Sequence, residues 1–529
     1  MQAHNIPIFK SWIPEWLARS VIFAVLMTSL FNFALYGRPM SMAGYYGVQP
    51  SDVQYAMVLT YASAVTFLAL DFRITKYFAP RKYLIIGLTL NSVSSLICFY
   101  SKNWGVFLIC GLVQGIACAL ICSIVLNMVF SRLQSTRARV IGYSIFYGAI
   151  QIAVPVYAIY SSVLLDVSDF NWLFFGLIVM LVALLFVILI TMNSKARFHK
   201  KMPLYKVDWI GYLYYLTFSS VAGYILIYGQ QLNWFDSTLI VLLTIFFIIL
   251  LFLFIAREKR LRHPIINLQI FKAKNFIKGL LLLFVFYIFK GTTGLTYGYI
   301  EVVLGTDPLH IIPIWLAVIL GTAVSMFVTA RFILMGVSLI RIIITGFIIM
   351  ACYYFYMLHF VSSTGETKDF ILPLFIYGVS TGVLFVPIVS FMASSAPPKV
   401  AFNASMVGIF ARFLGFSTSM AVNNYTQLYT RSEANDKVRE SITEINPQLS
   451  LTLKNIQQAY LNAGNDIYTS KGASNAYLNY FIKEQILIHS TKDYYDVMLV
   501  GLLVVIVILI FLPGIQNIVL KLRKGSIPY

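Results

Sequence analysis

Residues 171–192 read NWLFFGLIVMLVALLFVILITM and contain no charged side chain. A helix of about 20 residues is long enough to cross the hydrocarbon core of a bilayer. Such a helix also satisfies its own backbone hydrogen bonds where no water is present. This stretch therefore predicts a transmembrane helix, and the rest of the chain can be compared with it.

Similar apolar stretches recur along the whole chain, which is 59% hydrophobic and only 11% charged. Soluble domains carry about 25% charged residues, so this composition indicates a protein that lies mainly in lipid. We predict an all-α integral membrane protein with fourteen spans, at residues 18–37, 53–71, 83–101, 104–129, 139–163, 171–192, 208–228, 237–256, 277–301, 311–330, 338–359, 370–392, 402–424 and 496–516.

Lys and Arg gather in the loops that follow even-numbered spans, as in residues 195–206 and 257–274. The short loops after odd-numbered spans hold only Arg38, Lys102 and Lys368. Because positive loops stay on the cytoplasmic side, both termini are predicted to be cytoplasmic. The formal net charge of +19 is then explained by loop cations that meet anionic lipid headgroups, and it does not indicate nucleic-acid binding.

Three segments lie outside the predicted spans. Residues 1–17 are polar and aromatic and read as an interfacial helix, and residues 517–529 as a cytoplasmic tail. Residues 425–495 form a long exterior loop with balanced charge and helical periodicity, which predicts a helical hairpin with breaks near Gly464 and Gly472. It is either a cap on the exterior mouth or a docking surface for a partner.

Several motifs resemble those of a known family. The sequence DFRITKYFAPRK at 71–82 is similar to the cytoplasmic signature of the major facilitator superfamily, and LVQGIACA at 112–119 to its fourth-helix motif. Three further stretches resemble its fourteen-helix drug:proton antiporter branch: GQQLNWFDS at 229–237, RHPIINLQIFKAKNF at 262–276 and GIFARFLG at 408–415. The chain departs from the family pattern at Gly111, where arginine is usual, and at Asn32, where the first span often has an acid.

The resemblance implies the major facilitator fold, with two six-helix bundles and two inserted helices. The N-terminal bundle would occupy residues 18–192, the linker with its two helices 193–276, and the C-terminal bundle 277–516. It also implies a multidrug efflux protein of the bacterial inner membrane that works by alternating access. We expect it to export small amphipathic or anionic compounds, because its spans hold interior cations but no interior carboxylate. The long loop 425–495 would contact a periplasmic adaptor.

No GxxxxGK[ST] nucleotide-binding loop occurs in the sequence, so we expect the proton gradient, not a cofactor, to drive transport. An importer of an anionic nutrient or siderophore is the alternative. We do not expect an enzyme or a metal site, because no histidine, cysteine or acid cluster has ligand or nucleophile spacing.

Lys290, near the middle of the ninth predicted span, is the main candidate for substrate binding or coupling. A charge at this depth costs about 3 kcal/mol on insertion scales and is rarely kept without a use. With no carboxylate inside the spans, it must meet neutral acceptors, water or an anionic ligand. Helical spacing places Thr293, Tyr297 and Glu301 on the same face.

The other candidates for the central site are Arg412, Gln114, Gln151, Asn32 and Tyr61. Arg412 can recognise an anion or bind helix carbonyls, and the two glutamines can orient a ligand or bridge helices. Four residues form a candidate cytoplasmic gate that holds the outward-facing state: Asp71, Arg73, Arg81 and Lys82.

Overall fold

The computed structural model describes residues 8–132, 136–194, 196, 207–261, 264–362, 365–397, 400–441 and 447–511. Fourteen helices in these ranges are long and apolar enough to cross a membrane. The prediction of an all-α membrane fold with fourteen spans is therefore confirmed. The predicted cytoplasmic tail, residues 517–529, lies outside the described residues.

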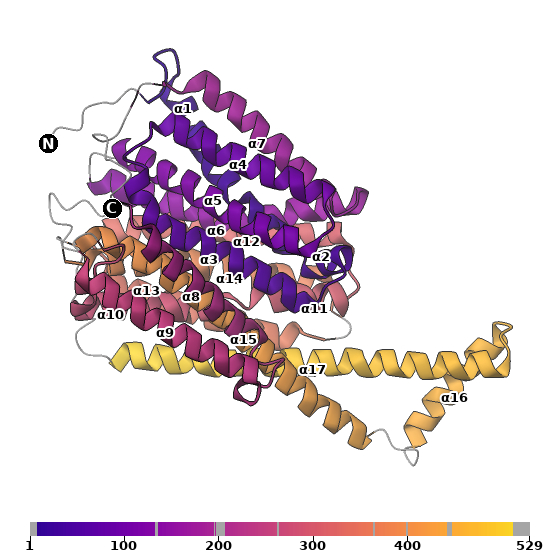
Figure 1. Cartoon of the computed structure of the whole chain (residues 1–529). Helices are drawn as coiled ribbons and strands as arrows, with labels where there is room; N and C mark the ends of the chain where they lie inside the picture. The colour runs from indigo at the N-terminus through magenta and orange to yellow at the C-terminus, as the bar shows by residue number, and fades with distance from the viewer. Residues whose placement is uncertain are drawn as a thin grey trace.

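The N-terminal half is a bundle of six spanning helices (Figure 1). Its helices are α1 (Glu15–Leu30), α3 (Pro50–Ile74), α4 (Pro80–Tyr100), α5 (Trp104–Arg132), α6 (Thr136–Val167) and α7 (Trp172–Thr191). The 3-10 helix η1 (Phe31–Gly37) and the short α2 (Pro39–Tyr46) link α1 to α3. Within this half α5 packs on α3 and α4, and α4 packs on α7.

The C-terminal half has the same number of spans. Its helices are α10 (Lys274–Lys290), α11 (Thr293–Val302), α12 (Ile312–Leu334), α13 (Leu339–Phe360), α14 (Ile371–Ser394), α15 (Ala401–Ser441) and α17 (Ile467–Phe511). Two of these, α10 and α11, share the ninth span. The short 3-10 helices η5 (Pro308–Ile311) and η6 (Thr367–Phe370) precede α12 and α14.

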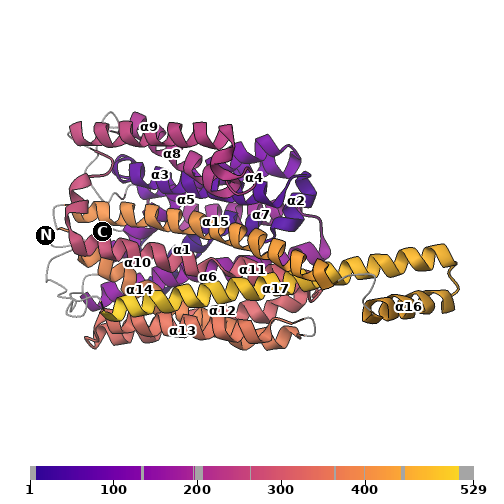
Figure 2. The same ribbon diagram turned by 90° about the horizontal axis from the view of Figure 1, so that it is seen from below.

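The two inserted helices, α8 (Trp209–Tyr228) and α9 (Thr238–Arg260), lie between the halves in sequence. The 3-10 helix η3 (Trp234–Asp236) joins them, and η4 (Leu268–Lys272) follows α9. Figure 2 shows α9 at the edge of the bundle, with α8 between it and the rest. Because α8 packs on both α3 and α15, it contacts one helix of each half.

The halves meet along two further pairs of helices, α6 with α12 and α3 with α15. Each pair takes one helix from either half, so side chains from α6 and α3 lie opposite side chains of the C-terminal half. Two charged residues of the C-terminal half, Lys290 and Arg412, lie against α6 at this interface.

A helical hairpin projects from one end of the bundle (Figures 1 and 2). It consists of the outer part of α15, α16 (Pro447–Asn462) and the first part of α17, with α16 packed on α17. Gly464 turns the chain between them with φ 90°, a left-handed conformation that favours glycine. Gly472, in contrast, lies inside α17, so the second predicted break is wrong. We call this end of the bundle the hairpin end and the other the opposite end.

Residues 8–14 do not form the interfacial helix expected from the sequence. Phe9 makes an isolated antiparallel bridge with Met192, at the end of α7. Pro14 is extended at ψ 153°, and α1 begins only at Glu15. The chain therefore enters the bundle by pairing with its own N-terminal half.

Candidate functional site: a cationic centre between the halves

Lys290 and Gln151, both predicted from sequence, are brought together across the two halves. The Lys290 ammonium at the end of α10 donates a hydrogen bond to the side-chain oxygen of Gln151 on α6. It also lies 5.4 Å from the ring centroid of Tyr287. Lys290 takes part in no ion pair recorded among the described residues. Its partner is a neutral acceptor, and its side chain is only partly buried.

Arg412 on α15 lies near the same centre and is 7% exposed. Its guanidinium carbon is 5.0 Å from the ring centroid of Tyr147 on α6 and 4.9 Å from that of Phe385 on α14. The rings themselves contact each other at 5.2 Å. Aromatic faces attract a cation through their quadrupole, so two rings from different halves hold this charge without a carboxylate.

The two cations are linked through neighbouring rings, since Tyr287, over which Lys290 lies, is 6.3 Å from Phe385, over which Arg412 lies. Two like charges in a region of low dielectric repel each other. An anion placed between them would relieve this repulsion. The arrangement is therefore chemically suited to bind a negative group.

Tyr61 on α3 also contributes to the interface between the halves. Its ring packs edge-on against Phe413 at 5.7 Å and Phe416 at 5.8 Å, both on α15. This predicted residue thus lies next to the helix that carries Arg412.

Two other predicted residues bind within the N-terminal half. Asn32 donates to the side-chain oxygen of Asn91 on α4 at 2.8 Å. Gln114 on α5 donates to Ser95 on α4 at 3.4 Å. Both side chains are almost fully buried, at 1% and 0% exposure. Their contacts join neighbouring helices and do not reach Lys290.

The helical face expected to carry Lys290, Thr293, Tyr297 and Glu301 is not continuous. The ninth span is broken, since α10 ends at Lys290 and α11 begins at Thr293, whose side chain lies outside the described residues. Tyr297 stacks on Trp315 with ring centroids 3.6 Å apart. The α-helical spacing failed here because residues 291 and 292 leave the helix.

The four predicted gate residues lie near the opposite end. Arg73 donates to the Pro264 carbonyl at 2.9 Å, and Arg81 donates to the Leu189 carbonyl in the last turn of α7 at 2.8 Å. Asp71 is fully buried, and Lys82 is exposed. The two arginines therefore bind carbonyls of other segments, one of them in the linker after α9.

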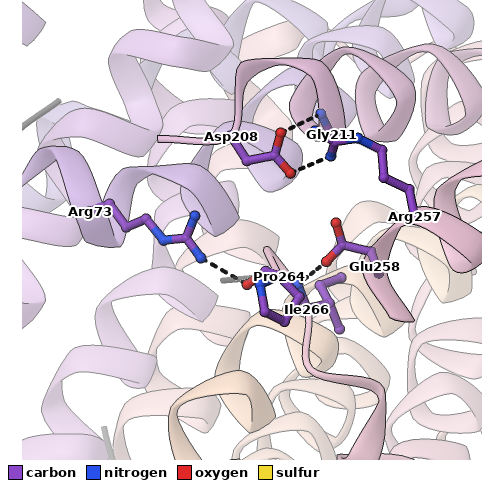
Figure 3. A network of polar contacts seen from close by, with 7 residues as sticks. All are labelled: Arg73, Asp208, Gly211, Arg257, Glu258, Pro264 and Ile266. Atoms are coloured by element: carbon purple, nitrogen blue, oxygen red, sulfur yellow. Dashed lines mark hydrogen bonds and ion pairs between the residues drawn. The ribbon is translucent and has the colours of Figure 1, made fainter. Parts of the chain in front are cut away.

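This linker is part of a polar network at the opposite end (Figure 3). Asp208, just before α8, accepts hydrogen bonds from the Arg257 side chain and from the Gly211 amide. Glu258 accepts from the Ile266 amide at 2.9 Å. Together with the bond from Arg73 to Pro264, these contacts tie α8, α9 and the following loop to the end of α3.

At the hairpin end, polar pairs join the halves directly. The side-chain amides of Gln54 on α3 and Asn424 on α15 bind each other reciprocally, at 2.7 and 3.4 Å. Arg38 lies 3.8 Å from Glu301. These pairs hold the halves together at the hairpin end.

A model of the Major Facilitator Superfamily matches residues 17–420. The two six-helix halves that meet at a cationic centre fit the architecture of a membrane transporter of this superfamily. The chain belongs to the Major Facilitator Superfamily, which confirms the family resemblance seen in the sequence.

The chain is similar to the probable multidrug resistance protein EmrY of Escherichia coli strain K12. The two are 24% identical over 71% of this chain and 72% of EmrY. The multidrug export protein EmrB of Haemophilus influenzae is 20% identical over 83% of this chain and 84% of its own. The fatty acid resistance protein FarB of Neisseria gonorrhoeae is 25% identical, over 49% of this chain and 50% of FarB.

Solved structures share the fold at low identity. A peptide transporter POT in complex with sulfate matches 93% of this chain and 95% of its own with a TM-score of 0.53 and 14% identity. The POT family transporter PepTSo matches 92% of this chain and 99% of its own with a TM-score of 0.52 and 12% identity. At this identity the likeness concerns the fold alone.

The sequence did not single out the aromatic partners of the two cations. Tyr147, Tyr287 and Phe385 are three among 83 aromatic residues, 34 Tyr, 42 Phe and 7 Trp. Only the folded arrangement distinguishes them. The sequence indicated only that the interior charges of Lys290 and Arg412 need stabilising partners, not which residues these are.

Proposed function

We propose that this chain is a multidrug-type exporter of the bacterial inner membrane that moves anionic or neutral amphipathic compounds out of the cytoplasm. The single observation that carries the substrate class is the pair of cations, Lys290 and Arg412, held between the halves by an amide and aromatic rings. A neutral acceptor leaves the ammonium with its full charge available to a ligand. The names of the relatives support export over the import of a nutrient or siderophore.

The proposed drive is the proton gradient, with no cofactor. Lys290 is the residue through which substrate charge and proton movement would be coupled, since an ammonium can lose its proton and a guanidinium cannot. The loop charges support a cytoplasmic position for the opposite end and both termini, and a periplasmic position for the hairpin end.

The direct test is transport in proteoliposomes with an imposed pH gradient, using anionic, neutral and cationic dyes. Lys290→Ala should reduce transport of the anionic dye at least tenfold, and Lys290→Arg should retain binding of that dye but lose the response to the pH gradient. Lys274→Ala is the matched control, because Lys274 is exposed at the other end of α10. Unchanged anionic transport by Lys290→Ala would contradict the proposed site.

The hairpin is the proposed docking surface for a periplasmic adaptor. Exposed apolar side chains support this, among them Leu451 at 62%, Tyr468 at 86% and Tyr480 at 59% exposure. Side chains of this kind on a projecting hairpin indicate a surface that binds another protein. Replacing residues 447–466 by a short glycine-serine linker should leave proteoliposome transport intact and lower export from whole cells. Equal export by cells would leave the hairpin as a cap only.

A further inference from the structure

The ninth span breaks next to the central lysine, and the break has a local cause. The sequence there is Lys290-Gly-Thr-Thr-Gly294, and glycine and threonine are poor helix formers. Gly291 caps α10 at φ −70° and ψ −1°, at the edge of the helical region, and residues 291 and 292 form a turn between α10 and α11. Thr292 precedes the first turn of α11.

A break inside a membrane leaves backbone carbonyls without their helical partners. Each such group costs several kcal/mol in a dry environment unless another donor reaches it. The carbonyls affected here belong to the last turn of α10, which includes Lys290 itself. Within the break, that of Ile288 accepts only a long bond from the Gly291 amide and that of Phe289 one from the Thr292 hydroxyl, both at 3.4 Å.

Three side chains from three other helices donate to consecutive carbonyls of this turn. Ser419 on α15 donates to the Ile288 carbonyl at 2.9 Å. Tyr354 on α13 donates to that of Phe289 at 2.6 Å, and Tyr377 on α14 to that of Lys290 at 2.8 Å. We call Ser419, Tyr354 and Tyr377 the hydroxyl collar. All three residues are buried, at 1% exposure for Ser419, 0% for Tyr354 and 4% for Tyr377.

The approach of α15 to the break is unusually close. A Cβ atom on Gly291 would overlap the Ser419 side chain. One turn earlier, a Cβ on Gly415 would lie 2.8 Å from the Cβ of Tyr287. Small residues thus bring the backbones of α10 and α15 together, which places the Ser419 hydroxyl within reach of a carbonyl.

The break also gives Lys290 a favourable position. It is the last residue of α10, where the partial negative charge of the helix end favours a cation. A continuous helix would place this negative end at Val302, about 18 Å away along the axis. Half-helix ends at the middle of the membrane are a known way to hold ions in transporters.

We infer that the hydroxyl collar positions Lys290, and that Ser419, Tyr354 and Tyr377 thereby set the preference of the central site for anionic substrates. The collar fixes the last turn of α10, and the fixed turn directs the ammonium toward Gln151 in the other half. These are positioning residues, since they bind the backbone and not the substrate. The inference rests on the proposed function, in which Lys290 recognises substrate charge.

The test uses the full-length protein in proteoliposomes and measures KM and the maximal rate for an anionic and a neutral dye of similar size. The variants Tyr377→Phe, Tyr354→Phe and Ser419→Ala each remove one oxygen atom. We expect KM for the anionic dye to rise about three- to tenfold, the effect of one lost hydrogen bond, with KM for the neutral dye unchanged. Combining two variants should raise KM for the anionic dye further.

Tyr353→Phe is the matched control. Tyr353 neighbours Tyr354 and is also fully buried, but its hydroxyl contacts the Thr296 side chain at 2.9 Å and not the α10 carbonyls. Its KM for the anionic dye should stay at the wild-type value. A merely structural role would lower the maximal rate for both dyes alike and would affect the control as well.

Three outcomes separate the two proposals. If Lys290→Ala and the collar variants all raise KM for the anionic dye, both stand. If only Lys290→Ala does so, or if the collar variants slow both dyes equally, the positioning role is wrong and the proposed function stands. If Lys290→Ala leaves KM for the anionic dye unchanged, both are wrong. Ser419→Ala keeps the test valid should a tyrosine variant fail to assemble, because alanine fits wherever serine does.

Discussion

Gln151 accepts a hydrogen bond from Lys290 and so joins α6 of the N-terminal half to α10 of the C-terminal half. This bond is a polar link between the halves at the centre of the site. Any movement that separates the halves there must break it or transfer the ammonium to another acceptor.

Gln151→Leu should therefore lower transport of an anionic dye about tenfold, because the ammonium loses an acceptor worth about 1.5 to 3 kcal/mol. Gln151→Glu should also slow turnover, for the opposite reason, since an ion pair holds the halves together more strongly. Initial rates in proteoliposomes measure both. Ile152→Leu, a change at the neighbouring position of α6, is the control, and full activity of Gln151→Leu would rule out a role for the bond.

The halves should separate at the hairpin end during transport, where Gln54 binds Asn424. We predict that Gln54→Cys with Asn424→Cys, in a chain whose native cysteines are replaced, loses transport when a short dithiol cross-linker is added. The cysteines to replace are Cys98, Cys110, Cys118, Cys122 and Cys352.

Cleavage of a reducible cross-linker should restore the rate. Each single-cysteine variant treated with the same reagent is the control. A cross-linked protein that transports at the full rate would show that this end does not open.

The ion pair of Asp208 and Arg257 should make stability depend on pH (Figure 3). Burial alone would raise the pKa of Asp208, but hydrogen bonds from Arg257 and Gly211 and the charge of Arg73 outweigh it and hold this pKa below its ordinary 3.8. A carboxyl whose pKa is lowered by folding stabilises the folded state above its unfolded pKa. This contribution is lost as the pH falls through the folded value.

Asp208→Asn should thus lower the thermal stability of the detergent-solubilised protein at pH 7 by about 1 kcal/mol, since the pair is partly exposed. At pH 3 the substitution should lower the stability less, so the stabilities of the variant and the wild type converge on acidification. Asp236→Asn, at an exposed position, is the control. A constant difference between pH 7 and pH 3 would contradict the assigned pair.

The orientation of the chain can be tested by cysteine labelling of cells. We predict that a cysteine at residue 450, in α16, reacts with an impermeant reagent from outside, whereas one at residue 200 reacts only after the membrane is opened. The physical reason is the concentration of cations in the loops that follow even-numbered spans. Labelling of both positions from one side would contradict the assigned orientation.

The spans and their number could be predicted from sequence because lipid imposes a length and a composition that each helix must meet alone. Lys290 and Gln151 could be proposed for a related reason, since an interior charge or amide stands out in an apolar segment. Asn32 and Gln114 satisfied the same criterion but bind within the N-terminal half. The rotation of a helix about its axis decides this, and a single sequence does not give it.

The break after Lys290 was missed because glycine and threonine also occur in unbroken membrane helices, as Gly378 and Thr381 do in α14. What makes the break stable lies elsewhere in the chain, at Ser419, Tyr354 and Tyr377. Donors that come from three other helices leave no periodic signal beside the residues they serve.

The length of α17 has a mechanical consequence. Its 45 residues run without interruption from the tip of the hairpin through the bundle, about 68 Å at 1.5 Å per residue. A single straight helix transmits tilt like a lever, so any rotation of the C-terminal half must swing the hairpin tip outside the membrane. A protein bound to that tip would be displaced in each transport cycle. If it held the tip in place, it would oppose the rotation and slow transport.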